Sequence, residues 1–145
     1  MPSLSGQCNP AIGPLVQIGV DPPLGTTPFT PSRVIQPIPT AHLFSGLLDT
    51  GATTSCISAA VVAALGISAA GMRPMGSATQ VSVATNTYLV DIALVFVGVN
   101  WWFPNLLAYE YVPSLNSGHQ VLIGRDVICQ GVFTLHTDGH FSFSI

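Results

Sequence analysis

The alternation of apolar and polar residues predicts strands along most of this chain. A period-two pattern or a short apolar run bounded by turn residues marks residues 15–20, 43–48, 80–85, 88–97, 131–136 and 140–145. Asn86 is predicted to turn the chain between two of these strands, and Asp138-Gly139 between the last two. One helix is predicted over residues 59–65, after Ser58 as N-cap and before Gly66, which suits a left-handed C-cap. The pattern therefore indicates an all-β domain with one or two short helices.

Three stretches lack a regular pattern. Residues 1–10 are predicted to be a loose leader, so that the folded domain spans residues 11–145. Residues 21–39 are rich in proline and threonine, which predicts an extended loop with room for a short edge strand at 33–36. Residues 109–119 are expected to be irregular.

Composition limits the classes of partner. A chain of 145 residues fits one domain; 48% of its residues are hydrophobic and only 6% are charged, with no lysine. Such a sparsely charged surface suggests that apolar area is buried against a second protein chain. The net charge is -3, and Arg33, Arg73 and Arg125 lie far apart in sequence, so no basic stripe for nucleic acid is expected.

The sequence gives no sign of membrane insertion or export. Residues 1–10 lack the basic start and apolar centre of a signal peptide, and the longest apolar stretch, 89–103, is interrupted and too short to span a bilayer. A soluble protein is expected, in the cytoplasm rather than secreted, although the compartment stays open. Cys8, Cys56 and Cys129 are odd in number and widely spaced, which favours free thiols, and Cys56 is favoured as a small core residue over a catalytic thiol.

Candidate chemistry lies at the end of the apolar run 43–48. The tetrapeptide Asp49-Thr50-Gly51-Ala52 places one carboxylate where a strand turns. Aspartic peptidases activate water between two carboxylates, one ionised and one protonated. Because the chain has one such tetrapeptide, this chemistry needs two chains. Further along, residues 121–126 (VLIGRD) form a second apolar run that leads into glycine.

The ordered pair of motifs resembles the retropepsin family of dimeric aspartic peptidases, over residues 13–145. The resemblance implies a closed barrel-like fold, a homodimer that binds an extended peptide substrate, and no cofactor or metal. It implies catalytic roles for Asp49, Thr50 and Gly51, with Thr50 bonding across the dimer. Substrate contacts are expected from the acid turn, a flap and the wall beyond it: Ala52, Thr53, Ser82, Val83, Ala84, Thr85, Tyr109 and Val112. The second motif, Leu122, Ile123, Gly124, Arg125 and Asp126, is expected to be structural.

The sequence also departs from the retroviral pattern. Thr53 stands where retroviral members carry an acidic partner for the arginine, so Arg125 and Asp126 are left to pair within the chain or across the interface. No glycine-rich flap tip is present, and the hairpin near 82–87 is equally consistent with an ordinary surface hairpin.

Other interpretations stay open for the chain as a whole. The main alternative is a catalytically silent peptide-binding or dimerisation module with the same fold. A third is an unrelated β-domain in which Asp49 is a turn residue. His136, Asp138 and His140 could hold a metal in principle, but the turn explains them without one.

Overall fold

The computed structural model describes residues 2–24, 36–77 and 80–145. The strands are β1 (Ser3–Gln7), β2 (Leu15–Asp21), β3 (Leu43–Leu48), β4 (Cys56–Ser58), β5 (Gly71–Ser77), β6 (Gln80–Phe96), β7 (Val99–Tyr111), β8 (Val121–Ile123), β9 (Val132–Leu135) and β10 (His140–Ser144). The helices are the 3-10 turn η1 (Thr40–His42), α2 (Ala59–Leu65) and α3 (Arg125–Ile128). No helix within the described ranges has the length and apolar character needed to cross a bilayer.

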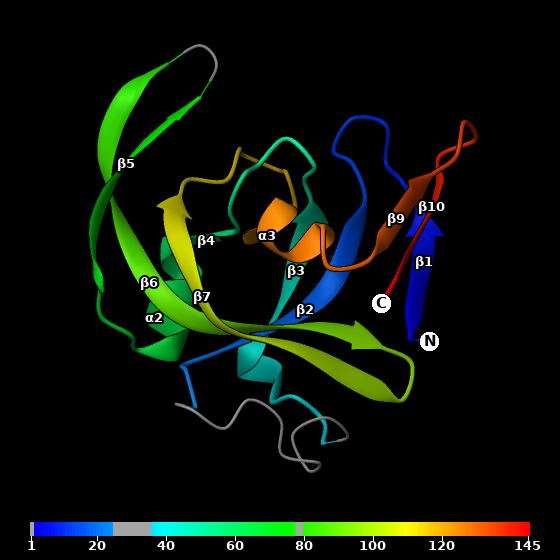
Figure 1. Cartoon of the computed structure of the whole chain (residues 1–145), viewed down its shortest axis with the longest axis horizontal. Coiled ribbons are helices and arrows are strands. Elements are labelled where there is room, and N and C mark those ends of the chain that lie inside the picture. Colours follow the sequence, from blue (N-terminus) through cyan, green and yellow to red (C-terminus); the bar gives the residue numbers. More distant parts are fainter. Residues whose placement is uncertain (1, 25–35, 78–79) are drawn as a thin grey trace.

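Six strands close into a barrel at the centre of the molecule (Figure 1). Their order is β2-β3-β8-β4-β7-β6, and β6 pairs again with β2 to complete the ring. Two contacts in the barrel are parallel, β3 with β8 and β4 with β7. The first of these places residues 46–48 directly beside residues 121–123. The barrel therefore brings the two motifs, 49–52 and 121–126, close together although they lie far apart in the sequence.

The inward side chains of these strands fill the barrel and form the core. Alternation along β2, β6 and β7 gives a buried set in which aliphatic residues dominate, because alternate residues of a strand face the same side. Its members include Ile18, Val20, Ile57, Val90, Ile92, Leu94, Phe103, Val121 and Ile123. Trp102 and Phe103 are both buried, whereas Trp101 is half-buried. The aromatic run 101–103 thus mainly serves the interior.

A separate three-stranded sheet, in the order β1-β10-β9, joins the two ends of the chain (Figure 1). Residues 3–7 pair with residues 140–144 along the whole of β1. The prediction of a loose leader is therefore wrong for this stretch. Its mixed, glycine-containing sequence gives no strand signal, but β10 offers a free edge whose backbone groups bind it. The division of the chain into a leader and a domain from residue 11 stays a prediction.

The prediction of a turn at Asn86 is also wrong. Strand β6 runs without interruption from Gln80 to Phe96, and Asn86 pairs with Met72 of β5. The pairing of β5 with β6 instead continues to Ser77 and Gln80, and this hairpin stands away from the barrel at the upper left of Figure 1. Pairing with β5 along residues 85–87, and also with β7 at Thr87, holds this polar stretch extended and outweighs its turn propensity.

The predicted helix is confirmed, whereas its N-cap and the irregular stretch 109–119 differ from the prediction. Residues 59–65 form α2, and Gly66 adopts the left-handed conformation with φ of 61°. The Ser58 side chain does not cap this helix, because its hydroxyl donates to Gln120 Oε1 at 2.6 Å. Strand β7 continues to Tyr111, so the irregular stretch is shorter than expected. The edge strand expected at 33–36 falls largely outside the described residues.

Candidate active site

Asp49 follows β3 directly, at the point where the acid loop (residues 49–52) begins. The Asp49 N–H donates to Ile123 O at 2.9 Å, which continues the pairing of β3 with β8 by one residue. The Gly51 N–H donates to Asp49 Oδ1 at 2.9 Å, and the Ala52 N–H donates to Asp49 O at 3.2 Å. The loop therefore folds back over its own carboxylate. A Cβ at Gly51 would lie 3.1 Å from Asp49 Oδ1, so glycine suits this close approach.

Arg125 ties the second motif to the acid loop within one chain. Its backbone N–H donates to Ala52 O at 2.9 Å. Its guanidinium donates to Thr53 Oγ1 at 3.1 Å and to Thr50 O at 3.4 Å. Thr53 thus supplies a neutral acceptor in the position where retroviral members carry an acid. The sequence left open whether Arg125 pairs within the chain or across an interface. The structure shows partners within the chain.

Asp126 binds Ser55, three residues beyond the acid loop. The Ser55 N–H donates to Asp126 Oδ2 at 2.9 Å, and the Ser55 hydroxyl donates to Asp126 Oδ1 at 2.8 Å. The same hydroxyl accepts the Gly124 N–H at 3.1 Å. Ser55 is fully buried, so these bonds replace contacts that the Ser55 groups would make with water. Sequence analysis did not find this role of Ser55, because a lone serine carries no pattern.

Gly124 makes the close contact between the two motifs possible. A Cβ built on Gly124 would lie 2.6 Å from the carbonyl carbon of Thr54 and 2.9 Å from Ser55 N. These are backbone atoms, which cannot turn aside as a flexible side chain would. Leu122 and Ile123 are the last two residues of β8 and precede Gly124. Ile123 is buried in the core, and Leu122 lines a cleft over Asp49. The motif thus supports the loop from behind.

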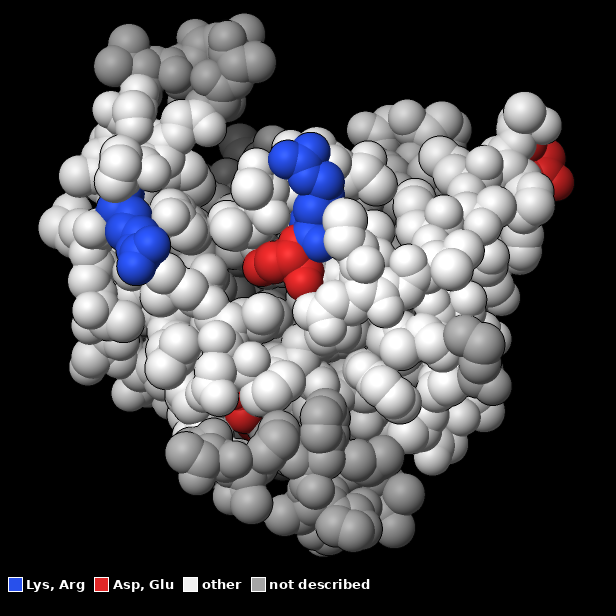
Figure 2. Space-filling view, viewed as in Figure 1, with Lys and Arg blue, Asp and Glu red and all other residues white. Residues whose placement is uncertain are grey.

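A cleft of about 570 Å³, here called the acid-loop cleft, opens over Asp49. It is hollowed between the acid loop and β5, and Figure 2 shows the hollow beside the β5–β6 hairpin on an otherwise almost uncharged face. The lining comes from the acid loop and the residues after it, from β5, and from β4, β7 and β8: Asp49, Gly51, Ala52, Thr53, Thr54, Cys56, Pro74, Met75, Gly76, Tyr109, Tyr111 and Leu122.

The structure brings only some of the predicted substrate-binding residues to this cleft. Ala52, Thr53 and Tyr109 line it. Residues 82–85 lie along β6, where residues 83–85 pair with residues 73–75 of β5, and they do not line the cleft. Val112 is 93% exposed and lines a different cavity. The hairpin does reach the cleft, but through Pro74, Met75 and Gly76. Gly76, next to Ser77, is the signal that could have extended the predicted hairpin beyond Asn86 to the pair of Ser77 and Gln80.

Cys56 lines the cleft but is unsuited to nucleophilic attack. Burial raises the pKa of the Cys56 thiol to about 11, and the charges of Asp126 and Asp49 act in the same direction. The thiolate is the nucleophilic form of cysteine, so a raised pKa leaves the group inert at neutral pH. All three cysteines are free.

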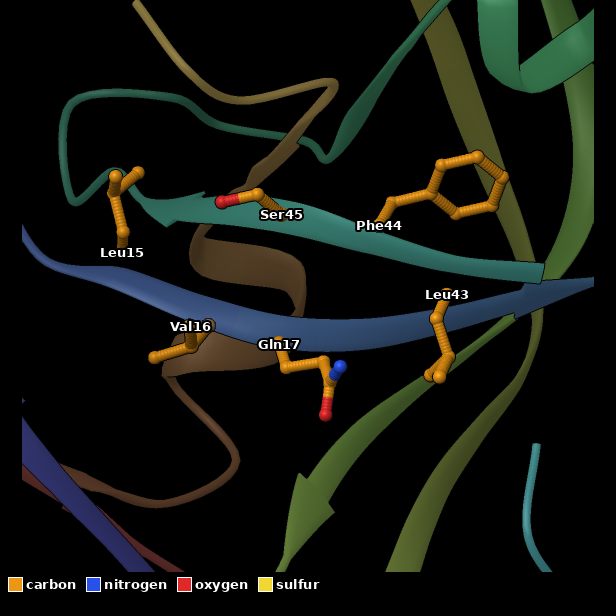
Figure 3. Close-up of a pocket in the computed structure, with 6 residues that line it drawn as sticks. All are labelled: Leu15, Val16, Gln17, Leu43, Phe44 and Ser45. Atoms are coloured by element: carbon orange, nitrogen blue, oxygen red, sulfur yellow. The ribbon is translucent and has the colours of Figure 1, made fainter. Parts of the chain in front are cut away.

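Two other places on the protein offer less chemistry than this site. An open groove of about 430 Å³ lies along β2 and β3, lined by Leu15, Val16, Gln17, Leu43, Phe44 and Ser45 (Figure 3). None of these side chains titrates, so the groove offers no acid or base.

The His136 and His140 ring centroids lie 5.6 Å apart, but the described residues hold no cluster of three His, Cys, Asp or Glu suited to a metal.

Comparison with known proteins places the chain in a family. The family model described as aspartyl protease matches residues 42–127, which is more than half of the chain and includes both motifs. The chain belongs to the aspartyl protease family. No match was found among curated proteins.

The fold of the chain is also similar to that of a solved structure. The crystal structure of a retropepsin-like aspartic protease from Rickettsia conorii aligns with a TM-score of 0.64 over 97% of this chain and 89% of that chain, at 12% identity. At this low identity the likeness concerns the fold. Together with the closed barrel and two short α-helices, it confirms the predicted retropepsin-like fold of this aspartyl protease family member.

Proposed function

We propose that this protein is an aspartic endopeptidase that acts as a homodimer, with one Asp49 from each chain. Two carboxylates held close together share one proton, because both cannot be ionised at short range. The ionised carboxylate takes a proton from the water between them, while the protonated one polarises the scissile carbonyl. The water oxygen attacks the carbonyl carbon, and a proton then passes to the leaving amine.

One observation carries this proposal: Asp49 lies in the acid-loop cleft, on a loop whose backbone is fixed from behind by the second motif. A fixed carboxylate beside open space is what water activation requires. The sequence has a single Asp-Thr-Gly, so the second carboxylate has to come from another copy. Thr50 is exposed in the single chain, in keeping with a contact across a dimer.

The cleft supports an extended peptide as substrate. Tyr109, Leu122 and Met75 give it apolar walls, which favour apolar side chains next to the scissile bond. Strand β5 borders the cleft opposite the acid loop, so its backbone is placed to pair with an extended chain. We assign substrate contact to Ala52, Thr53 and Tyr109 from the predicted set. Residues 74–76 take the place of residues 82–85 and Val112.

Cleavage of a peptide library by the wild type and by Asp49→Asn tests the proposal. The amide is nearly isosteric but cannot accept the proton, so cleavage should be lost while the fold remains. Asp138→Asn is the matched control, because Asp138 is exposed in the distant β9–β10 turn. The Asp138→Asn protein should cleave normally. Undiminished cleavage by Asp49→Asn would refute the mechanism. Peptide binding without cleavage by the wild type would favour the silent binding module.

Dilution tests the dimer separately. Specific activity should fall as the protein concentration drops below the dissociation constant of the dimer, measured in parallel by sedimentation. Full activity at a concentration where sedimentation finds only single chains would rule out a shared site.

A further inference from the structure

Tyr111 and His119 form a hydrogen-bonded pair beside the acid-loop cleft. Tyr111 ends β7, and His119 lies in the segment that leads into β8. The Tyr111 Oη and the His119 Nδ1 are 2.8 Å apart. The two rings are nearly parallel, with an angle of 11° between their planes and 6.0 Å between their centroids. His119 is only 8% exposed, so its ring sits in the protein rather than in water.

Tyr111 separates two open spaces. It lines the acid-loop cleft on one side and a second cavity of about 380 Å³ on the other. Residues 112–118 surround the second cavity, and two apolar side chains there, Val112 and Leu115, are 93% and 95% exposed. The second cavity is therefore bordered by solvent-exposed side chains. A displaced Tyr111 ring has room to move into it.

The backbone next to His119 is fixed. The Ser58 N–H donates to Gln120 O at 3.0 Å, and the Ser58 hydroxyl donates to Gln120 Oε1 at 2.6 Å. The Gln120 N–H donates to Ser45 O at 2.9 Å. Since His119 precedes this anchored residue, its imidazole offers Tyr111 a fixed partner. The hydroxyl bond to Nδ1 then determines where the Tyr111 ring lies.

The surroundings favour the neutral imidazole. Burial lowers the pKa of His119, and the charge of Asp49, in the acid loop, opposes this shift without cancelling it. Burial raises the pKa of Tyr111, so its hydroxyl keeps its proton. Cys56 of β4 also raises the pKa of Tyr111. The Cys56 thiol keeps its own proton, because the pKa of Cys56 is raised to about 11. Gln120 and Ser58 carry no charge. Within this pair, the group that changes charge in mild acid is thus His119.

A proton on His119 therefore favours an open arrangement. The imidazolium is less stable in this buried place than in water, so proton uptake shifts the population towards conformers in which the ring reaches solvent. In those conformers the bond to the Tyr111 hydroxyl is broken.

We propose that His119 is a positioning residue: its neutral ring fixes Tyr111 as a wall of the acid-loop cleft, and its protonation releases Tyr111 towards the second cavity. The cleft then accepts larger substrate side chains in acid than at neutral pH. The effect on substrate choice rests on the proposed peptidase function, whereas the movement of Tyr111 does not.

An NMR titration tests the movement without any substrate. The Tyr111 ring signals should shift with the same midpoint as the His119 imidazole, and this shift should disappear in His119→Gln, which keeps a neutral acceptor but does not titrate. Tyr88→Phe is the matched control, because the Tyr88 hydroxyl bonds to Glu110 Oε1 at 3.0 Å, away from His119. It should leave the titration of Tyr111 unchanged. Tyr111 signals that stay constant while His119 titrates would overturn the proposal.

Kinetics with two peptides test the consequence. The peptides differ only in an alanine or a phenylalanine beside the scissile bond. The ratio of their kcat/KM values should change in favour of phenylalanine by about tenfold between pH 7 and pH 5, since differences in pocket size have effects of this order. In His119→Gln and Tyr111→Phe the ratio should be independent of pH. A ratio that changes equally in these variants would contradict the role of the pair. Failure of the wild type to cleave any peptide would instead contradict the proposed function and leave the NMR result to decide the movement.

Discussion

Removal of the Asp126 carboxylate should destabilise the protein through the loop that carries Asp49. The substitution Asp126→Ala deletes the acceptor of three hydrogen bonds, two from Ser55 and one from the Val127 N–H at 3.0 Å. Val127 keeps a second acceptor, Gly124 O at 3.1 Å. Ser55 is fully buried, so its N–H and hydroxyl are the two donors that lose their acceptor.

The size of the effect follows from these two donors. A buried donor left without an acceptor costs about 1–3 kcal/mol. Asp126 itself is half-exposed, so water can replace part of the lost carboxylate. We therefore expect the free energy of unfolding to fall by about 3 kcal/mol in Asp126→Ala, in the lower half of the combined range. For a chain of this length this corresponds to a decrease in Tm of about 10 °C. Asp126→Asn keeps one acceptor oxygen and should lose about half as much.

Urea unfolding at fixed protein concentration measures these changes, because a dimer makes apparent stability depend on concentration. A double-mutant cycle with Ser55→Ala isolates the contact between the two side chains, and its coupling energy should be about 1–2 kcal/mol. Asp138→Ala is the control: the Asp138 carboxylate accepts the exposed His140 N–H, and its loss should change stability by less than about 0.5 kcal/mol. An Asp126→Ala change as small as that of the control, or a coupling energy of zero, would refute this account of the loop.

Three further predictions follow from the structure. Deletion of residues 2–7 should lower the free energy of unfolding by about 3 kcal/mol in urea, because it uncovers β10 with its buried Phe141 and Phe143; an unchanged midpoint would contradict the pairing of β1. Gly124→Ala should cost about 1–3 kcal/mol and abolish peptide cleavage, because its Cβ would meet the Thr54 backbone at 2.6 Å; full activity would show that the loop tolerates displacement. Stability should fall as the pH drops below about 6.5, because the unfolded chain then binds a proton that His119 takes up only at lower pH in the fold; urea midpoints in His119→Gln should lack this component, and an identical loss in both proteins would exclude His119 as its source.

Much of the barrel could be predicted from sequence because its strands are buried on one side. Residues 15–20 and 43–48 carry the apolar alternation that burial imposes, and both form strands at these positions. The two terminal strands β9 and β10 flank the Asp138-Gly139 turn, and Gly139 has the positive φ of 87° that favours glycine. In these segments local preference and burial agree.

The errors arose where pairing partners decide the structure. Strand β1 lacks a pattern of its own and is extended because β10 lies beside it. Asn86 lies in a run of polar residues that resembles a turn, yet Met72 faces it across the hairpin. Local sequence cannot reveal such partners, since they are distant along the chain or weakly patterned. The misplaced turn at Asn86 then displaced the expected substrate contacts from β5 to β6.

The candidate site was more predictable in its motifs than in its connections. Asp49 and Gly124 were found from two short patterns, and the parallel pairing of β3 with β8 explains why these patterns occur together. The partners that join them, Thr53 and Ser55, are a threonine and a serine of a kind common on any surface. Their roles depend on where Arg125 and Asp126 point, and the sequence left that open.

These connections bear on what a dimer has to supply. The acid loop is held by its own chain: Asp49 bonds to Ile123, and Arg125 bonds to Ala52 and Thr53. Each of these contacts lies within one chain, so the shape of the loop does not depend on a second copy. In the proposed dimer, association would bring two already shaped loops together rather than create them. The ordering cost of the loop is then met during folding, which leaves more of the interface energy for placing the two carboxylates.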